Sequence, residues 1–128
     1  MTRTRSAGAP RGWPRVIPRL IVKNPKALVG FLRLVFGAKG RYQDERPAEM
    51  WIGNSLVLVS GTGIRRTYTA LLYLYVPDAD ATFRRAKKAG ARTIEAPMDL
   101  PYGDRRAMFA DRWGNTWQVA TRRPRSRS

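Results

Sequence analysis

The two residue types that carry most acid-base and nucleophilic chemistry, His and Cys, are both absent from this chain of 128 residues. Their absence excludes an imidazole base, a Ser-His relay, a thiolate nucleophile, a disulfide framework and a structural zinc site. The groups that remain for proton transfer are Tyr73, Tyr75, Tyr102, Glu49 and Asp104. No spacing among them marks a catalytic pair, and a catalytic role would require strong tuning of their acid strength.

The chain is strongly basic, with 25 Lys and Arg against 9 Asp and Glu and a net charge of +16. Four Arg lie in residues 1–15 and four in residues 122–128, and neither segment holds an acid. Both segments are rich in Pro, Ser or Gly, so we expect two disordered basic tails. The tails favour weak, salt-sensitive, non-specific contact with nucleic acid, whereas the remaining bases are scattered and form no stripe with interleaved aromatics.

The length and apolar content predict one folded domain, because 43% of the residues are hydrophobic. The longest apolar run, residues 71–76, is six residues long and much too short for a membrane helix. The basic start has no apolar region of the kind found in secretion signals. We therefore expect a cytoplasmic protein with no membrane partner.

The order of predicted elements repeats, which indicates an internal duplication of about fifty residues. Val22 and Val76 lie 54 positions apart, and each ends an apolar strand that leads into a helix. Asn24 and Asp78 are good helix caps, and Gly37 is a typical helix end. The first half is expected to hold strands at 16–23, 39–43, 47–52 and 55–60 and a helix at 25–37. The second is expected to hold strands at 69–76, 92–96, 105–110 and 116–120 and a helix at 78–89.

Four segments in this order resemble the vicinal oxygen chelate superfamily, which includes glyoxalase I, bleomycin-resistance proteins and extradiol dioxygenases. They are Val22-Lys-Asn-Pro with Phe36-Gly-Ala, Ile52-Gly-Asn-Ser, Pro101-Tyr-Gly-Asp-Arg and Asp111-Arg-Trp-Gly-Asn. The resemblance implies an α+β fold in which two tandem βαβββ units form a cup-shaped mixed sheet. It covers a domain of residues 16–121, with unit one at 16–60, a linker at 61–68 and unit two at 69–121. Many members are homodimers, and we expect one here.

The resemblance also locates the positions that bind a metal in the family's enzymes. They correspond to Ile17, Leu71, Gln118 and one residue within the apolar stretch 56–59. A lone Gln cannot hold Zn²⁺, Fe²⁺ or Mn²⁺, since such sites need about three or more N, O or S ligands. The fold and the cup are therefore expected without the metal chemistry, and no cofactor is predicted.

Strand alternation predicts which side chains line the cup. The candidate ligand-binding residues are Ile17, Arg19, Ile21, Trp51, Leu71, Tyr73, Tyr75, Tyr102, Arg106, Met108, Thr116 and Gln118. Tyr73 and Tyr75 could instead fill a collapsed cup or a dimer interface, and Trp51 could simply pack. Arg19 needs an anionic or carbonyl partner, either an internal acid or a ligand. Asp104 and Arg105 are expected to form a loop-fixing ion pair rather than catalytic groups.

Three functions remain open. The first is a metal-independent binding protein that sequesters an aromatic or anionic compound, as bleomycin-resistance proteins do; cationic bleomycin itself does not suit a basic chain. The second is a metal-independent enzyme of the same superfamily, and we lean against catalysis because no residue pair marks it. The third is binding of nucleic acid or an anionic surface through the Arg-rich tails.

Overall fold

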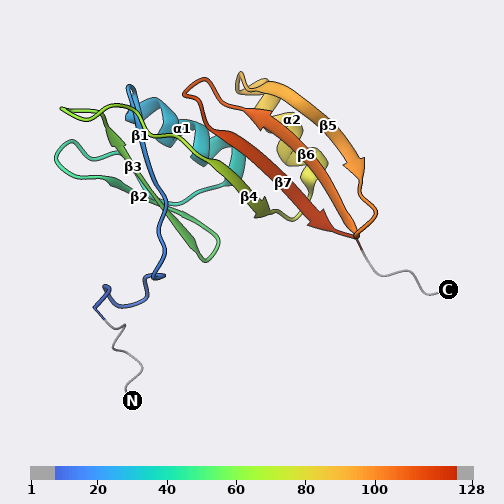
Figure 1. Ribbon diagram of the computed structural model, residues 1–128, viewed down its shortest axis with the longest axis horizontal. Coiled ribbons are helices and arrows are strands. Elements are labelled where there is room, and N and C mark those ends of the chain that lie inside the picture. The colour runs from blue at the N-terminus through green and yellow to red at the C-terminus, as the bar shows by residue number, and fades with distance from the viewer. Residues whose placement is uncertain (1–7, 124–128) are drawn as a thin grey trace, which may run out of the picture.

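The computed structural model describes residues 8–123 and forms two sheets with one helix in each half (Figure 1). Unit one holds β1 (Arg19–Val22), α1 (Pro25–Phe36), β2 (Ala48–Ile52) and β3 (Ser55–Gly61). Unit two holds β4 (Leu71–Tyr75), α2 (Ala79–Lys88), β5 (Arg92–Asp99), β6 (Asp104–Ala110) and β7 (Thr116–Arg122). The predicted α+β class is confirmed, and hydrogen bonding divides the strands into two sheets.

The sheet of unit one has the strand order β1-β3-β2, with β1 and β3 parallel and β2 and β3 antiparallel. The predicted turn at Gly53-Asn54 joins β2 to β3, since Ile52 pairs with Ser55. Helix α1 begins after Asn24, whose side chain accepts a hydrogen bond from the Ala27 backbone N–H at 3.2 Å. The helix ends at Gly37, which adopts the left-handed conformation with φ of 65°.

The predicted strand at 39–43 does not form, so unit one has one strand fewer than expected. Lys39 makes a single antiparallel bridge to Trp51, with both N–H to O distances at 2.8 Å. The next residue, Gly40, has φ of 139° and lies against the Glu49 carbonyl oxygen, where a Cβ atom would clash. The pairing with β2 is limited to this one bridge, and the close approach that follows it is open only to glycine.

The sheet of unit two has the order β4-β7-β6-β5, and its strand and helix content follows the predicted βαβββ pattern. β4 runs parallel to β7, while β6 is antiparallel to both β7 and β5. Asp78 caps α2 as predicted, with its side chain 3.1 Å from the Ala81 N–H.

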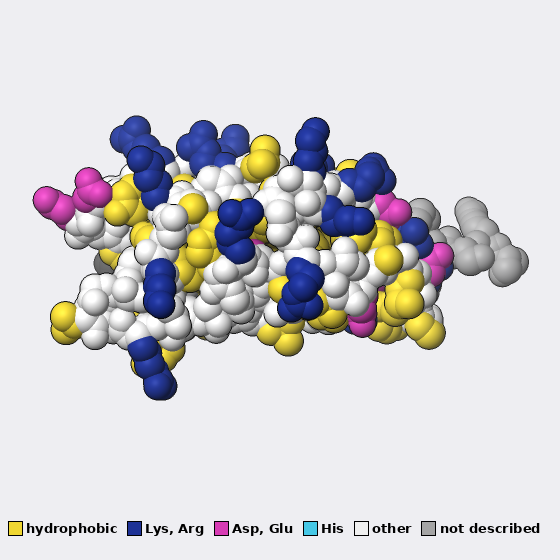
Figure 2. Space-filling view, turned by 90° about the horizontal axis from the view of Figure 1, so that it is seen from above, with side chains coloured by type: hydrophobic (Ala, Val, Ile, Leu, Met, Phe, Trp, Pro, Cys, Tyr) yellow, Lys and Arg dark blue, Asp and Glu magenta, His cyan; other side chains and the backbone are white. Residues whose placement is uncertain are grey.

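Helix α2 separates basic from apolar side chains. Phe83 and Ala86 are buried, while Arg84, Lys87 and Lys88 are exposed, as the sequence predicts. Figure 2, seen from above, shows Lys and Arg side chains spread along the length of the molecule, with acidic side chains near the two ends. On this face the positive charge is therefore dispersed rather than gathered into one stripe.

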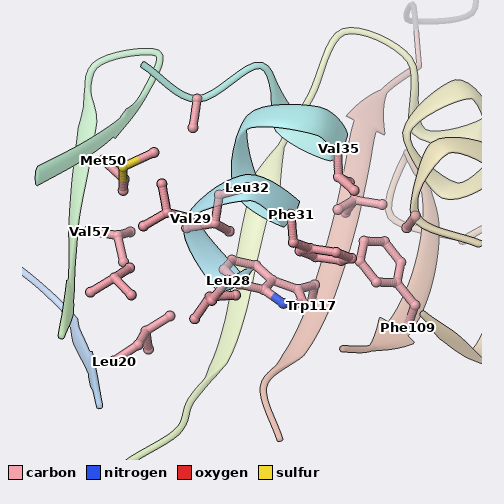
Figure 3. Packing of buried hydrophobic residues seen from close by; sticks show 14 of the residues in the cluster. Leu20, Leu28, Val29, Phe31, Leu32, Val35, Met50, Val57, Phe109 and Trp117 are labelled. Atoms are coloured by element: carbon pink, nitrogen blue, oxygen red, sulfur yellow. The ribbon is translucent and has the colours of Figure 1, made fainter. Parts of the chain in front are cut away.

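One apolar core joins the two units, and α1 lies between their sheets (Figure 3). Leu28 and Leu32 pack with unit one, while the Phe36 ring lies 4.9 Å from the Trp117 ring. The Trp117 Nε1–H donates to buried Asp111 at 2.9 Å, so this large side chain is buried with its polar atom satisfied. The units are thus two halves of one folding unit.

Several predicted boundaries need correction. β1 begins at Arg19 rather than at residue 16, and Val16 is exposed. β7 continues to Arg122, which we had assigned to a disordered tail; pairing with Asp104 on β6 extends the strand. Residues 8–15 are also described and include a turn in which the Trp13 N–H donates to the Pro10 carbonyl. The rest of the expected tails, residues 1–7 and 124–128, lies outside the described residues. No helix within 8–123 is long and apolar enough to cross a membrane.

Candidate functional site

The structure gathers the predicted site residues of unit two on one face of its sheet. Tyr73 on β4 pairs with Gln118 on β7, which pairs in turn with Met108 on β6. Because alternate residues of a strand share a face, the same face carries further predicted residues. They are Leu71, Tyr75, Arg106 and Thr116. The opposite face, with Trp117 and Phe109, belongs to the common core. We call the face that carries Tyr73, Gln118 and Met108 the open face.

The open face exposes aromatic and apolar surface that a folded core would normally hide. Leu71 is 63% exposed, Tyr75 57%, Tyr102 54% and Tyr73 40%. The rings of Tyr73 and Tyr75 meet edge to face, with centroids 5.7 Å apart. Within the described residues 8–123, Tyr73 and Tyr75 therefore do not fill a collapsed cup, which was one of the predicted alternatives. Contiguous exposed apolar surface of this kind is typical of ligand sites and interfaces.

A buried carboxylate holds the phenol groups of the open face. Asp104 is fully buried, and its Oδ2 accepts hydrogen bonds from the hydroxyls of Tyr73 at 2.5 Å and Tyr75 at 2.8 Å. Its other oxygen, Oδ1, lies 3.0 Å from Nε of Arg122. The Tyr102 hydroxyl lies 3.1 Å from that of Tyr73. Asp104 therefore anchors two rings of the site at their distal ends.

Arg106 extends this network and is neutralised within it. Its Nη2 lies 3.0 Å from Oε1 of Glu95, and its Nη1 donates to the Tyr102 hydroxyl at 3.4 Å. With Asp104 and Arg122 the network holds two acids and two bases, so its formal charge is zero. Arg106 was predicted as a polar residue lining the cup, and the structure pairs it there with an internal acid.

The pKa shifts in the network point away from proton transfer near neutral pH. Burial raises the pKa of Tyr73 far above its usual value, and the hydrogen bond to Asp104 raises it further. The hydrogen bond from Tyr73 in turn lowers the pKa of Asp104. Tyr73 therefore stays a protonated donor and Asp104 an ionised acceptor, which suits a fixed binding surface better than a general base.

The expected ion pair between Asp104 and Arg105 is wrong, because adjacent residues on β6 point to opposite faces. Arg105 instead lies 2.7 Å from Asp80 on α2 and 3.2 Å from Asp99 on β5. Its two partners are 25 and 6 residues away in sequence. The hydrogen bonds from Tyr73 and Tyr75 to Asp104 were not predicted either. These tyrosines lie on β4, which is separated from β6 by β7 in the sheet.

Three of the four predicted site residues of unit one lie in the other sheet, and the fourth lies just before it. Ile17 precedes β1, and Ile21 is buried with its backbone bonded to Tyr68. Arg19 is exposed, and its Nε donates to Ser60 at 3.2 Å. Trp51 is half-buried beside the Lys39 bridge. Among the described residues, the hydrogen bonds of these side chains and backbones stay within unit one and the linker, away from the open face.

A cleft of about 760 Å³ separates β4 from unit one, next to the open face. It is lined by the β2–β3 hairpin, by residues of the segment 14–18 and by β4, including Tyr73 and Tyr75. Phe36 and Trp117 also line it. The hairpin turn and the proline-rich segment were not among the predicted site residues, and the sequence signal for the segment is an apolar Val16 between Pro14 and Pro18. The cleft is mostly apolar and of a size that takes a small organic molecule.

The residues at the family's metal positions do not fit a metal. The pairing of Arg19 with Leu58 matches that of Tyr73 with Gln118, so Leu58 is the fourth position, beside Ile17, Leu71 and Gln118. Three of these are hydrocarbon side chains. Among residues 8–123 no group of three His, Cys, Asp or Glu side chains could hold a metal ion.

The comparisons define the class of protein. The model of the Glyoxalase/Bleomycin resistance protein/Dioxygenase superfamily matches residues 15–119, and the chain belongs to this superfamily. The resemblance drawn from the sequence is thereby confirmed.

Solved structures show the same fold. TioX from Micromonospora sp. ML1 is 24% identical, with a TM-score of 0.73 over 85% of this chain and 98% of that one. A family enzyme from Burkholderia phytofirmans PsJN is 19% identical, with a TM-score of 0.69 over 82% and 95%. At these identities the likeness shows the fold alone. An uncharacterized protein of Mycobacterium tuberculosis H37Rv is 42% identical over 48 residues, which are 38% of this chain and 28% of that protein. The match thus spans less than a third of that curated relative.

Proposed function

We propose that this protein is a metal-independent binding protein that holds a flat aromatic small molecule against the open face and the adjoining cleft. The observation that carries the proposal is the exposed aromatic surface of Tyr73 and Tyr75, whose rings are fixed by a buried carboxylate. Fixed rings offer broad faces for stacking at a small cost in side-chain entropy. Release of the compound unchanged, as in antibiotic sequestration, fits a site with no poised base.

The geometry favours an aromatic over an anionic ligand. Arg106 is paired with Glu95, and the polar network of the open face has no net charge. Arg19 is the charged residue predicted for unit one, and it lies on the other sheet. Apolar burial and stacking, rather than ion pairing, would then supply most of the affinity. A homodimer, which the resemblance implies, is part of the proposal as a second copy covering part of the exposed surface.

The test is a titration of the protein with a panel of planar aromatic compounds, followed by backbone amide NMR shifts. Tyr73→Ala should weaken binding by about 5- to 150-fold, which corresponds to roughly 1–3 kcal/mol. Tyr68→Ala is the matched control, because Tyr68 is also exposed but lies in the linker. Equal effects of the two variants, or no binding in the panel, would refute the proposal.

Mass spectrometry of the bound compound separates binding from catalysis. Recovery of the compound at its original mass supports sequestration, whereas a new mass that accumulates with time establishes an enzyme. Elemental analysis of the purified protein is expected to find no stoichiometric transition metal, and about one Zn, Fe, Mn or Ni per chain would contradict metal independence.

A further inference from the structure

The tyrosine hydroxyls of the open face are held in a defined direction. Asp104 is an ionised carboxylate and can only accept hydrogen bonds, so the hydrogens of Tyr73 and Tyr75 both point to it. The 2.5 and 2.8 Å distances are short, as expected for bonds to a charged acceptor. With its own hydrogen committed, Tyr73 can only accept at its 3.1 Å contact with Tyr102, so Tyr102 donates there.

None of the three tyrosines therefore has a hydroxyl hydrogen left for a ligand. Each of the three tyrosines has one hydrogen, and each hydrogen already has an acceptor within the network. Arg106 donates to Tyr102 through Nη1 and to Glu95 through Nη2, and its side chain is mostly buried. The Nε of Arg106 is fully enclosed and cannot reach a ligand. The phenol oxygens can therefore offer a ligand only lone pairs.

The other polar groups on this face do not change the balance. Gln118 is half-buried on β7, and its amide offers both a donor and an acceptor. Thr116, also half-buried, can likewise do either. A ligand carbonyl or carboxylate that approaches the hydroxyls of Tyr73 and Tyr75 meets lone pairs there, whereas a ligand hydroxyl or N–H finds an acceptor.

We propose that Asp104 is a positioning residue that turns the tyrosine hydroxyls inward, so that the open face selects uncharged aromatic compounds carrying a hydroxyl or N–H donor. The inference rests on the proposed function and adds the chemical class of the ligand. It also assigns a role to a buried carboxylate that contacts no ligand itself and acts through Tyr73 and Tyr75.

Three probes with the same ring system test the selectivity at neutral pH. They are 2-naphthol, which is an uncharged donor, 2-methoxynaphthalene, which lacks the hydrogen, and 2-naphthoate, which is an anionic acceptor. Amide NMR titrations should give 2-naphthol the tightest binding, about three- to tenfold tighter than the other two. Equal binding of all three would overturn the inference while leaving the proposed function standing. Failure of all three to bind would overturn both.

The role of Asp104 is tested with Asp104→Asn, whose amide can donate to the phenol oxygens and free their hydrogens. We expect the preference for 2-naphthol over 2-methoxynaphthalene to fall to within about twofold. Asp99→Asn is the matched control, because Asp99 is an ion-paired carboxylate of the same sheet that contacts no tyrosine in the described network. An unchanged preference in Asp104→Asn would overturn the inference.

A second readout does not depend on any ligand. The ultraviolet absorbance of tyrosinate, followed in an alkaline titration, should show the highest phenol pKa moving down in Asp104→Asn and unmoved in Asp99→Asn. The movement should be partial, because burial of Tyr73 remains. If Asp104→Asn fails to fold, the double variant Tyr73→Phe with Tyr75→Phe keeps both rings and removes the acceptors. It should lose the same preference, and retention of the preference there would overturn the inference.

Discussion

The two units share a backbone plan, but they differ in where they bury polar groups. The buried polar residues found within 8–123 are Thr82, Asp104, Asp111 and Asn115, and all of them belong to unit two. Unit one buries aliphatic side chains around α1 instead. At the 54-residue offset, unit two has Tyr73 where unit one has Arg19, and Tyr75 where unit one has Ile21.

The difference shows which parts of the duplication are constrained by folding. Leu20 and Leu74 occupy equivalent positions toward the core, and their strand partners Val59 and Val119 are identical in type. The opposite faces have diverged, since Leu58 corresponds to Gln118. Core positions keep their apolar character because packing demands it, while the faces away from the core are free to acquire a site.

The largest expected change in stability comes from truncating the side chains at two equivalent core positions, one in each unit. Trp117→Ala should destabilise the protein by about 3–5 kcal/mol, because it empties a large buried volume and removes one of the hydrogen bonds that buried Asp111 accepts. Val57→Ala, at the equivalent position of unit one, should cost about 1–3 kcal/mol. Urea unfolding measures both. Equal costs would show that the Asp111 network adds nothing to the stability of unit two.

A second test addresses the missing strand of unit one. Gly40→Ala should cost more than about 2 kcal/mol, since a Cβ would strike the Glu49 carbonyl and the φ of 139° suits only glycine. Gly53→Ala is the control: its φ is also positive, but nothing surrounds the added Cβ, so about 1–2 kcal/mol is expected. Thermal and urea unfolding of both variants would show the ranking. A mild effect of Gly40→Ala would mean that the close contact relaxes easily.

Local sequence signals predicted much of this fold. Asn24 and Asp78 as caps, Gly37 as a helix end and the turn at Gly53-Asn54 are all confirmed, because each depends on a few neighbouring residues. The strand expected at 39–43 is reduced to one bridge at Lys39, next to a close contact between Gly40 and Glu49. That contact depends on how the chain folds back, which the local pattern does not contain.

The site was predicted in part for the same reason. Strand alternation placed Tyr73, Gln118 and Met108 on one face correctly, since their register follows from the pairing of neighbouring strands. It could not show that Asp104 bonds Tyr73, because the two residues are 31 positions apart and meet only through sheet order. Nor could it show that Glu95 neutralises Arg106, since β5 carries register shifts between Thr93 and Met98.

The buried carboxylate of unit two should also appear in the pH dependence of stability. The pKa of Asp104 is lowered in the folded state, so its contribution is present above the unfolded value of about 3.9 and is lost as pH falls through the folded pKa. Asp104→Asn should therefore be less stable than the parent near pH 6, with the gap closing in acid. Urea unfolding from pH 7 to 3 measures this gap. The control Glu45→Gln, an exposed carboxylate of unit one, should stay close to the parent throughout.

The smallest expected effect distinguishes the faces of the two units as ligand sites. Arg19 is exposed and makes one hydrogen bond, to Ser60, so Arg19→Ala should change stability by no more than about 0.5 kcal/mol. If ligand lies against unit two alone, the variant should bind 2-naphthol and 2-naphthoate within about twofold of the parent, since the interaction of distant exposed charges is largely screened at physiological salt. Weaker binding of 2-naphthoate alone would show instead that the Arg19 guanidinium of unit one interacts with the bound ligand. Both units, rather than one, would then contact the ligand.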